Sequence, residues 1–347
     1  MARKAKKVGV AVIGVGIGRA HLHGYAQSPH ARIVAVCDID RERADRVAAE
    51  FNVPQVFTDH RKMLRMDGLD AVSVGTPNYL HAPQTIDCLR AGKHVLVEKP
   101  PAMNVKEAEA MLRAAKKARR ILMIAFSSRY GGEAQVAKRF AEAGDLGRMY
   151  WGKAIYLRRS GIPRGWFGVK KMAGGGPMID LGVHALDLTW WLMGKPKPVA
   201  VMGSTYAEIG HKGKGMSAYG LGGGAGKFDV EDLAIGMVKF AGGETINIEV
   251  SWATQIDHDV YTFMVCGTEG GMASGPLRVF KDLRGTQVDL TPRVPNISGH
   301  DAECAHFVEC IVEGKKPMSP GEDGVAVQKM LDAIYLSAAT GREVRIK

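Results

Sequence analysis

Residues 8–124 alternate short apolar runs with amphipathic segments, and this rhythm constrains the fold more than any other feature of the chain. The runs are VGVAVIG, ARIVAVCD, QVF, DAVSVGT, KHVLVEK and RRILMIAF, and helical periodicity appears between them in RERADRVAAEF, QTIDCLRAG and VKEAEAMLRAAKKA. Continuously apolar strands are typical of a parallel sheet that helices cover on both faces. This half of the chain therefore predicts a doubly wound α/β domain.

The pattern changes after about Tyr130. Helices are expected over residues 133–142 and in the segment ending TWWLMGK, and the runs DLAIGMVKF, ETINIEVSWA and VYTFMVCG alternate as in an antiparallel or mixed sheet. Two closing helices are expected over residues 301–313 and 324–339. The glycine-rich residues 210–226 lack periodicity and predict a mobile loop.

The length of 347 residues is that of two domains, and we expect a boundary between 1–128 and 129–347. The C-terminal helix can pack back on the first domain. The predicted class is thus α/β plus α+β, with a second domain on a large open, mainly antiparallel sheet. Hydrophobic residues make up 46% and charged residues 24%, which is typical of a globular protein.

The formal charge of +11 raises the question of a nucleic-acid partner. Basic residues cluster in ARKAKK, in RAAKKARR and over residues 158–171, but without an RNA-binding or helix-turn-helix pattern. They are better explained as solvated surfaces that attract anionic ligands, so no nucleic-acid partner is expected.

Five scattered cysteines without a C-x-x-C pair favour free thiols in a reducing compartment. Cys304, His306 and Cys310 fall in a helix-like stretch where core packing is the better interpretation, so no metal site is expected. No apolar run approaches the roughly 20 residues that span a bilayer, and no cleavable signal segment is evident. We therefore expect a cytoplasmic protein without a membrane partner.

The segment VIGVGIGRAH, residues 12–21, has the strand, glycine turn and helix start of a dinucleotide-binding motif. Its third glycine comes one residue earlier than in G-x-G-x-x-G. Glycines there let backbone N–H groups approach a pyrophosphate at the positive end of the helix. The residues expected to bind the cofactor at this turn are Gly14, Gly16, Ile17 and Gly18.

Asp38 ends the next strand, 20 residues after Gly18. At this spacing a carboxylate can accept hydrogen bonds from the adenosine ribose hydroxyls, and it would repel a 2′-phosphate. NAD is therefore favoured over NADP, although the nearby Arg41 and Arg43 weaken that preference.

Two later strand ends complete the expected cofactor site. The segment TPNYLH follows the fourth strand and is expected to border the nicotinamide ribose, although a simple Pro-Asn turn explains it equally well. The segment VEKPPA follows the fifth strand, at the sheet edge where ligands bind. The residues concerned are Thr76, Pro77, Asn78, His81, Glu98 and Lys99.

The segments VEKPPA, GGGPMIDLGVHALDL and MSPGEDGVAVQKMLDAIYLSAATGREVRI, with IGVGIGRAH, VCDID, TPNYLHAP and SRY, resemble the glucose-fructose oxidoreductase, inositol dehydrogenase and MocA (Gfo/Idh/MocA) family over essentially the whole chain. The resemblance implies a Rossmann domain that binds NAD(P). It also implies a second domain whose open sheet mediates homodimer or homotetramer contacts, and a sugar or cyclitol substrate. It places Lys99 beside substrate and nicotinamide, with Asp180 and His184 at the reacting hydroxyl.

The same residues make chemical sense without the resemblance. Oxidation of a secondary alcohol needs a base for the hydroxyl proton while hydride leaves for nicotinamide C4. His184 suits the base, Asp180 four residues earlier shares its helix face, and Lys99 can anchor the developing alkoxide. The alternatives are a solvated Lys99 and an Asp180 that caps a helix starting at Leu181.

Three residues in the predicted second domain are expected to line the sugar pocket. Arg129 and Arg158 can donate hydrogen bonds to a sugar, and Trp166 can stack on its apolar ring face.

The expected function is therefore an NAD(P)-dependent dehydrogenase of a sugar, sugar derivative or cyclitol. Two other functions stay open. One is a glycoside hydrolase that retains NAD and acts by transient oxidation and elimination. The other is a cofactor-binding regulator without turnover, because a fold alone does not decide function.

Overall fold

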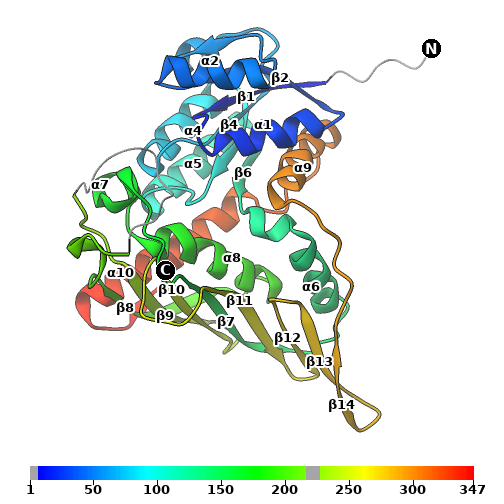
Figure 1. Ribbon diagram of the computed structural model, residues 1–347. Helices are drawn as coiled ribbons and strands as arrows, with labels where there is room; N and C mark the ends of the chain where they lie inside the picture. Colours follow the sequence, from blue (N-terminus) through cyan, green and yellow to red (C-terminus); the bar gives the residue numbers. More distant parts are fainter. Residues whose placement is uncertain (1–6, 216–226) are drawn as a thin grey trace. The chain divides into compact units, whose positions relative to one another are not determined.

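The computed structural model describes residues 7–215 and 227–347, and it divides into two compact units (Figure 1). Unit 1 comprises Met1–Tyr130 and Ile297–Val325, and unit 2 comprises Gly131–Asn296 and Ala326–Lys347. Helix α10 (Gly321–Thr340) contributes residues to both units. Most of the loop predicted over residues 210–226 lies outside the described residues.

Unit 1 contains the predicted parallel sheet. Its six strands follow the order β3-β2-β1-β4-β5-β6, and every neighbouring pair is parallel. The order reverses between β1 and β4, which is the position where sheets of this class bind ligands. The strands are β1 (Val8–Ile13), β2 (Ala31–Cys37), β3 (Val56–Phe57), β4 (Ala71–Val74), β5 (His94–Glu98) and β6 (Leu122–Ala125).

Local sequence explains the helices between these strands. Asp40 caps α2 and Asn104 caps α5, each accepting a hydrogen bond from a backbone N–H in the first turn. Helix α9 returns to unit 1 and packs on α1, where Phe307 and Val308 join the core with Leu22 and Tyr25. The α-helices are α1 (Gly18–Gln27), α2 (Arg41–Glu50), α3 (His60–Met63), α4 (His81–Arg90), α5 (Val105–Ala118) and α9 (Gly299–Glu313), with short 3-10 helices η1 (Asn78–Leu80) and η2 (Ser127–Tyr130).

Unit 2 is built on a nine-stranded sheet in the order β14-β13-β12-β11-β7-β10-β9-β8-β15. All its strand pairs are antiparallel except β7 with β10, so the sheet is mainly antiparallel as predicted. The strands are β7 (Met149–Leu157), β8 (Pro198–Tyr206), β9 (Leu233–Phe240), β10 (Thr245–Ser251), β11 (Val260–Gly267), β12 (Gly270–Ala273), β13 (Arg278–Leu283), β14 (Thr286–Leu290) and β15 (Val344–Arg345).

One face of this sheet is covered and the other is open. Helices α6 (Gly132–Glu142) and α8 (Val183–Leu192) lie along the covered face, whereas α7 (Lys170–Ala173) is a single turn (Figure 1). In β9, Ala234 and Val238 are buried, while Ile235 between them is exposed. This alternation is typical of a sheet with one solvated face.

Among the described residues, no helix combines the length and the apolar character needed to cross a bilayer.

Candidate functional site

The turn between β1 and α1 has the geometry of a phosphate-binding loop despite its shortened glycine spacing. Gly14 has φ +82°, and a Cβ there would lie 2.5 Å from the Gly75 carbonyl oxygen. A Cβ on Gly18 would lie 2.5 Å from the Val12 side chain, so glycine lets α1 pack closely on β1. Gly16 and Ile17 are exposed, and the first N–H groups of α1 follow directly. Such groups are suited to an anion like pyrophosphate.

Asp38 connects this turn to the next helix. Its Oδ2 accepts a hydrogen bond from Val15 N at 3.0 Å, and its Oδ1 accepts from Asp40 N at 3.0 Å and Arg43 Nη2 at 2.5 Å. The hydrogen bond to Asp38 raises the pKa of the Arg43 guanidinium. Arg43 is thus engaged by the same carboxylate that is expected to exclude a 2′-phosphate.

His81 connects the ends of β4 and β5. Its ring nitrogens lie 2.7 Å from the Pro100 carbonyl oxygen and 2.8 Å from that of Thr76, and burial lowers its pKa. The side chain is 1% exposed. Both ring nitrogens thus face backbone carbonyls, and the ring connects the two loops, while the expectation that His81 borders the cofactor stays a prediction. Thr76 and Pro77 are half-exposed beside it, whereas Asn78 is buried.

Glu98 lies in a buried cluster that sequence reasoning missed. Its Oε1 is 3.0 Å from His21 Nε2, and its Oε2 accepts a hydrogen bond from Lys99 N at 3.1 Å. On α9, Glu303 Oε1 lies 3.9 Å from His21 Nε2 and 3.0 Å from His300 Nδ1. The available signal for this cluster was His21 in the segment GRAH, which lies in the first turn of the helix after the glycine turn.

The pKa values of the two carboxyl groups in this cluster shift in opposite directions. Burial alone would raise the pKa of Glu98, but the hydrogen bond and charge of His21 lower it to about 2. Burial raises the pKa of Glu303. Glu98, which directly precedes the half-exposed Lys99 in the chain, is thus ionised. The cluster brings imidazole and carboxylate atoms within 4.8 Å of one another, and the expectation of no metal site stays a prediction.

In unit 2, Asp180 and His184 lie on one continuous helical segment, as predicted. The π-helical turn η4 (Met178–Gly182) runs directly into α8. From residue 175 to residue 193, every residue is buried except Asp180 and His184, which are half-exposed. Asp180 lies inside the segment, so the alternative that it caps a helix starting at Leu181 is wrong. Single π-helical turns are frequent at functional sites.

Two long-range contacts hold this segment. Glu231 accepts hydrogen bonds from Gly176 N at 2.9 Å and Met178 N at 3.2 Å, and Tyr335 donates to the same carboxylate at 2.7 Å. Trp252 Nε1 donates to Asp180 Oδ2 at 2.8 Å. Neither Glu231 nor Trp252 stands in a recognisable motif, so nothing in the sequence indicated them.

The three residues expected to line the sugar pocket have different surroundings. Arg158 is half-buried, with Nη2 3.3 Å from the Tyr156 hydroxyl, and Trp166 stacks on Phe167 with centroids 4.0 Å apart. Arg129 is 0% exposed and donates to Asp323 Oδ2 at 2.7 Å and to the Met318 carbonyl oxygen at 2.8 Å. Within unit 1 the Arg129 guanidinium is thus fully buried in an ion pair, and its expected substrate role stays a prediction.

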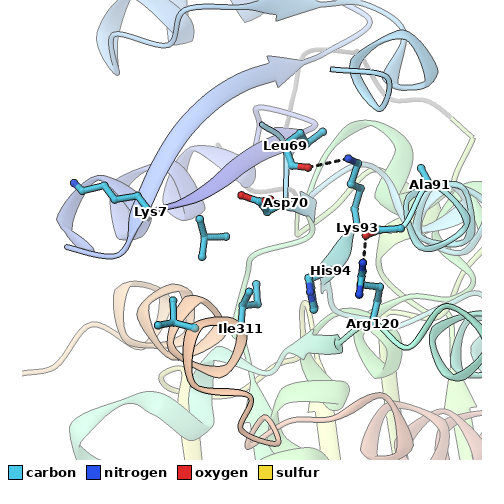
Figure 2. Close-up of a pocket in the computed structure, with 11 residues that line it drawn as sticks. Lys7, Leu69, Asp70, Ala91, Lys93, His94, Arg120 and Ile311 are labelled. Atoms are coloured by element: carbon cyan, nitrogen blue, oxygen red, sulfur yellow. Dashed lines mark hydrogen bonds between the residues drawn. The ribbon is translucent and has the colours of Figure 1, made fainter. Parts of the chain in front are cut away.

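Unit 1 also contains a cavity of about 640 Å³ (Figure 2). It is lined by residues at the amino ends of β1, β4 and β5, the opposite edge of the sheet from the glycine turn. Its Lys93 and Arg120 donate to the carbonyl oxygens of Leu69 and Gly92, at 2.8 Å and 2.6 Å. Because ligands of such sheets bind at the carboxyl ends, this cavity is not the expected cofactor site.

Two protein-family models match the chain. Residues 8–126 match the model of an oxidoreductase family with an NAD-binding Rossmann fold. Residues 134–273 match the model of the GFO/IDH/MocA C-terminal domain.

Named relatives cover nearly the whole chain. A D-glucoside 3-dehydrogenase of Escherichia coli is 32% identical over 344 residues, which is 97% of each chain. A scyllo-inositol 2-dehydrogenase (NAD(+)) of Bacillus subtilis is 30% identical over 329 residues, covering 90% of this chain and 88% of the relative. The structure of a levoglucosan dehydrogenase in complex with NADH superposes with a TM-score of 0.88 at 26% identity, covering 99% of this chain and 100% of that one. The chain belongs to the Gfo/Idh/MocA family of oxidoreductases.

Proposed function

We propose that this protein is an NAD-dependent dehydrogenase that transfers hydride between nicotinamide C4 and a secondary alcohol of a sugar, sugar derivative or cyclitol. The observation that carries the proposal is the exposure of Asp180 and His184 alone within the buried residues 175–193. Ionisable side chains at the accessible positions of an otherwise buried segment are candidates for acid–base roles. The names of the relatives support the substrate class.

The residues of unit 1 fit the cofactor. Gly14 leaves the space that a Cβ would fill, and the exposed Gly16 and Ile17 directly precede the first turn of α1. Asp38 presents a buried carboxylate at the end of β2. We propose NAD over NADP because a 2′-phosphate there would meet that carboxylate, with Arg43 already paired to it.

The proposal assigns a role to the cofactor and to each of the three polar side chains His184, Asp180 and Lys99. Bound NAD supplies the hydride acceptor at nicotinamide C4. A ring nitrogen of His184 accepts the hydroxyl proton as the hydride leaves, and Asp180 orients the substrate or the imidazole. Lys99 donates a hydrogen bond to the reacting oxygen and stabilises the charge that develops there.

We also propose that the open sheet face of unit 2 joins copies of the chain into a homodimer or homotetramer. Exposed apolar side chains on that sheet support this proposal, including Met202, Ile235 and Met264. All five cysteines are free, which supports a cytoplasmic location.

The proposal is tested by NADH absorbance during incubation with NAD, then NADP, and a panel of glucosides, aldoses, anhydrosugars and inositols. NADH formation with one ring class, and a loss of kcat of about 10²- to 10⁴-fold in His184→Ala, are expected. His258→Ala, on an exposed residue of unit 2, is the matched control.

Two results would contradict this proposal. Full turnover in His184→Ala would remove the assigned base. Release of free sugar from a glycoside without net NADH formation would instead favour the NAD-retaining hydrolase.

A further inference from the structure

We propose that Trp252 is a positioning residue for the reaction, because its indole N–H holds the carboxylate of Asp180 in one orientation. This inference rests on the proposed function. It names a residue 72 positions from Asp180 in the chain.

Trp252 cannot easily turn away from Asp180. It directly follows β10, its backbone N–H donates to the Asp232 carbonyl oxygen at 3.0 Å, and the side chain is 0% exposed. Its ring packs in a cluster that includes Leu181, the residue next to Asp180. The rings of Phe167 and Phe228 approach it edge-on, each with centroids 6.5 Å away. The direction of the indole N–H is therefore set by close packing.

The hydrogen bond has a chemical consequence for the carboxylate. An indole N–H is a donor only, and a buried one needs an acceptor. Nε1 donates to Asp180 Oδ2 at 2.8 Å, which is the length of a charge-assisted bond. A bond to one carboxylate oxygen restricts the rotation of the group about its Cβ–Cγ bond.

This arrangement combines a half-exposed carboxylate with a rigid support behind it. Asp180 lies on a π-helical turn, where the backbone hydrogen bonds differ from those of the α-helix that follows. Trp252, which directly follows β10, supports the Asp180 carboxylate from outside this helical segment. Groups that act on a reacting centre need such support to keep their geometry.

The test replaces the donor while keeping the apolar ring, in Trp252→Phe. Trp190→Phe is the matched control, since Trp190 is also buried in unit 2 and its Nε1 donates to the Pro196 carbonyl oxygen at 2.8 Å. We expect Trp252→Phe to lower kcat about tenfold to hundredfold, which corresponds to one hydrogen bond to a charged group. Trp190→Phe is expected to keep kcat, and both variants should keep the Kd for NAD.

A double-mutant cycle separates positioning from a general structural effect. If Trp252 acts through Asp180, Trp252→Phe should add no further loss of kcat in an Asp180→Ala background, which lacks the acceptor. Equal kcat in Trp252→Phe and Trp190→Phe, or fully additive losses in the cycle, would overturn the inference. Unchanged kcat in Asp180→Ala alone would instead refute the role of Asp180 in the proposed function.

A second variant covers the case in which Trp252→Phe does not fold. Incorporation of benzothienylalanine at position 252 replaces the N–H group by sulfur and keeps the size and shape of the ring. The same loss of kcat is expected, with circular dichroism spectra that match the parent protein. A folded variant with parental kcat would refute the proposed role of the hydrogen bond.

Discussion

The buried ion pair between Arg129 and Asp323 gives a prediction whose size follows from its surroundings. Side-chain exposure is 0% for Arg129 and 7% for Asp323, and Arg129 Nη1 lies 2.7 Å from Asp323 Oδ2. Removal of Asp323 would leave a guanidinium charge away from water with part of its hydrogen bonding lost. Breaking a buried pair in this way typically costs about 3–5 kcal/mol. We therefore expect Asp323→Ala to lower the free energy of unfolding by about that amount.

The neighbouring residue provides the control. Glu322 pairs with Lys116 at 3.2 Å, but the side chains are 49% and 64% exposed. Exposed pairs contribute about 0–1 kcal/mol, so Glu322→Ala should have little effect. Replacing both members, in Arg129→Met with Asp323→Ala, should recover part of the loss, because no buried charge then lacks its partner.

The assay is urea unfolding followed by far-UV circular dichroism, which records both units. Tryptophan fluorescence, recorded in parallel, reports unit 2 alone, because Trp151, Trp166, Trp190, Trp191 and Trp252 all belong to it. Equal destabilisation by Asp323→Ala and Glu322→Ala would refute the assignment of Arg129 to a structural pair. A double variant less stable than Asp323→Ala would refute the account of the buried charge.

Three further predictions concern unit 1. Asp38→Ser should raise the ratio of kcat/KM for NADP to that for NAD by about tenfold or more, because the variant loses a negative charge near the expected 2′-phosphate and releases Arg43. An unchanged ratio, or an equal change in the control Asp45→Ser, would contradict this. Gly14→Ala should lower the free energy of unfolding more than Gly92→Ala does, and calorimetry should detect no NAD binding to Gly14→Ala. Positive φ costs about 1–2 kcal/mol at both positions, but of the two only Gly14 would place its Cβ against a carbonyl oxygen, at 2.5 Å. Burial and the charge of Arg120 lower the pKa of His94 from 6.5 to about 4. As pH falls from 6.5 to 4, His94 is protonated in the unfolded chain before it is protonated in the folded protein, so the free energy of unfolding should decrease over this range. That loss should be smaller in His94→Gln and unchanged in His258→Gln by thermal unfolding, and equal pH slopes in all three proteins would exclude His94 as its source.

The sequence by itself determined the architecture of both sheets to a large extent. The six apolar runs became β1 to β6, and alternating runs in the second half became β9, β10 and β11. Local periodicity carries this information, because burial on one face or on both faces of a strand requires a matching order of side chains. The same local information placed Asp180 and His184 on one helical segment, since their spacing is a property of a helix.

Only the tertiary structure decided which partners these residues have. Arg129 pairs with Asp323, 194 positions later in the chain. The ring nitrogens of His81 face the carbonyl oxygens of Thr76 and Pro100, which follow two different strands. Trp252 and Glu231 carried no local pattern at all. Such contacts join elements that are distant in the chain, and they depend on how strands and helices pack, which the order of residues within one element does not specify.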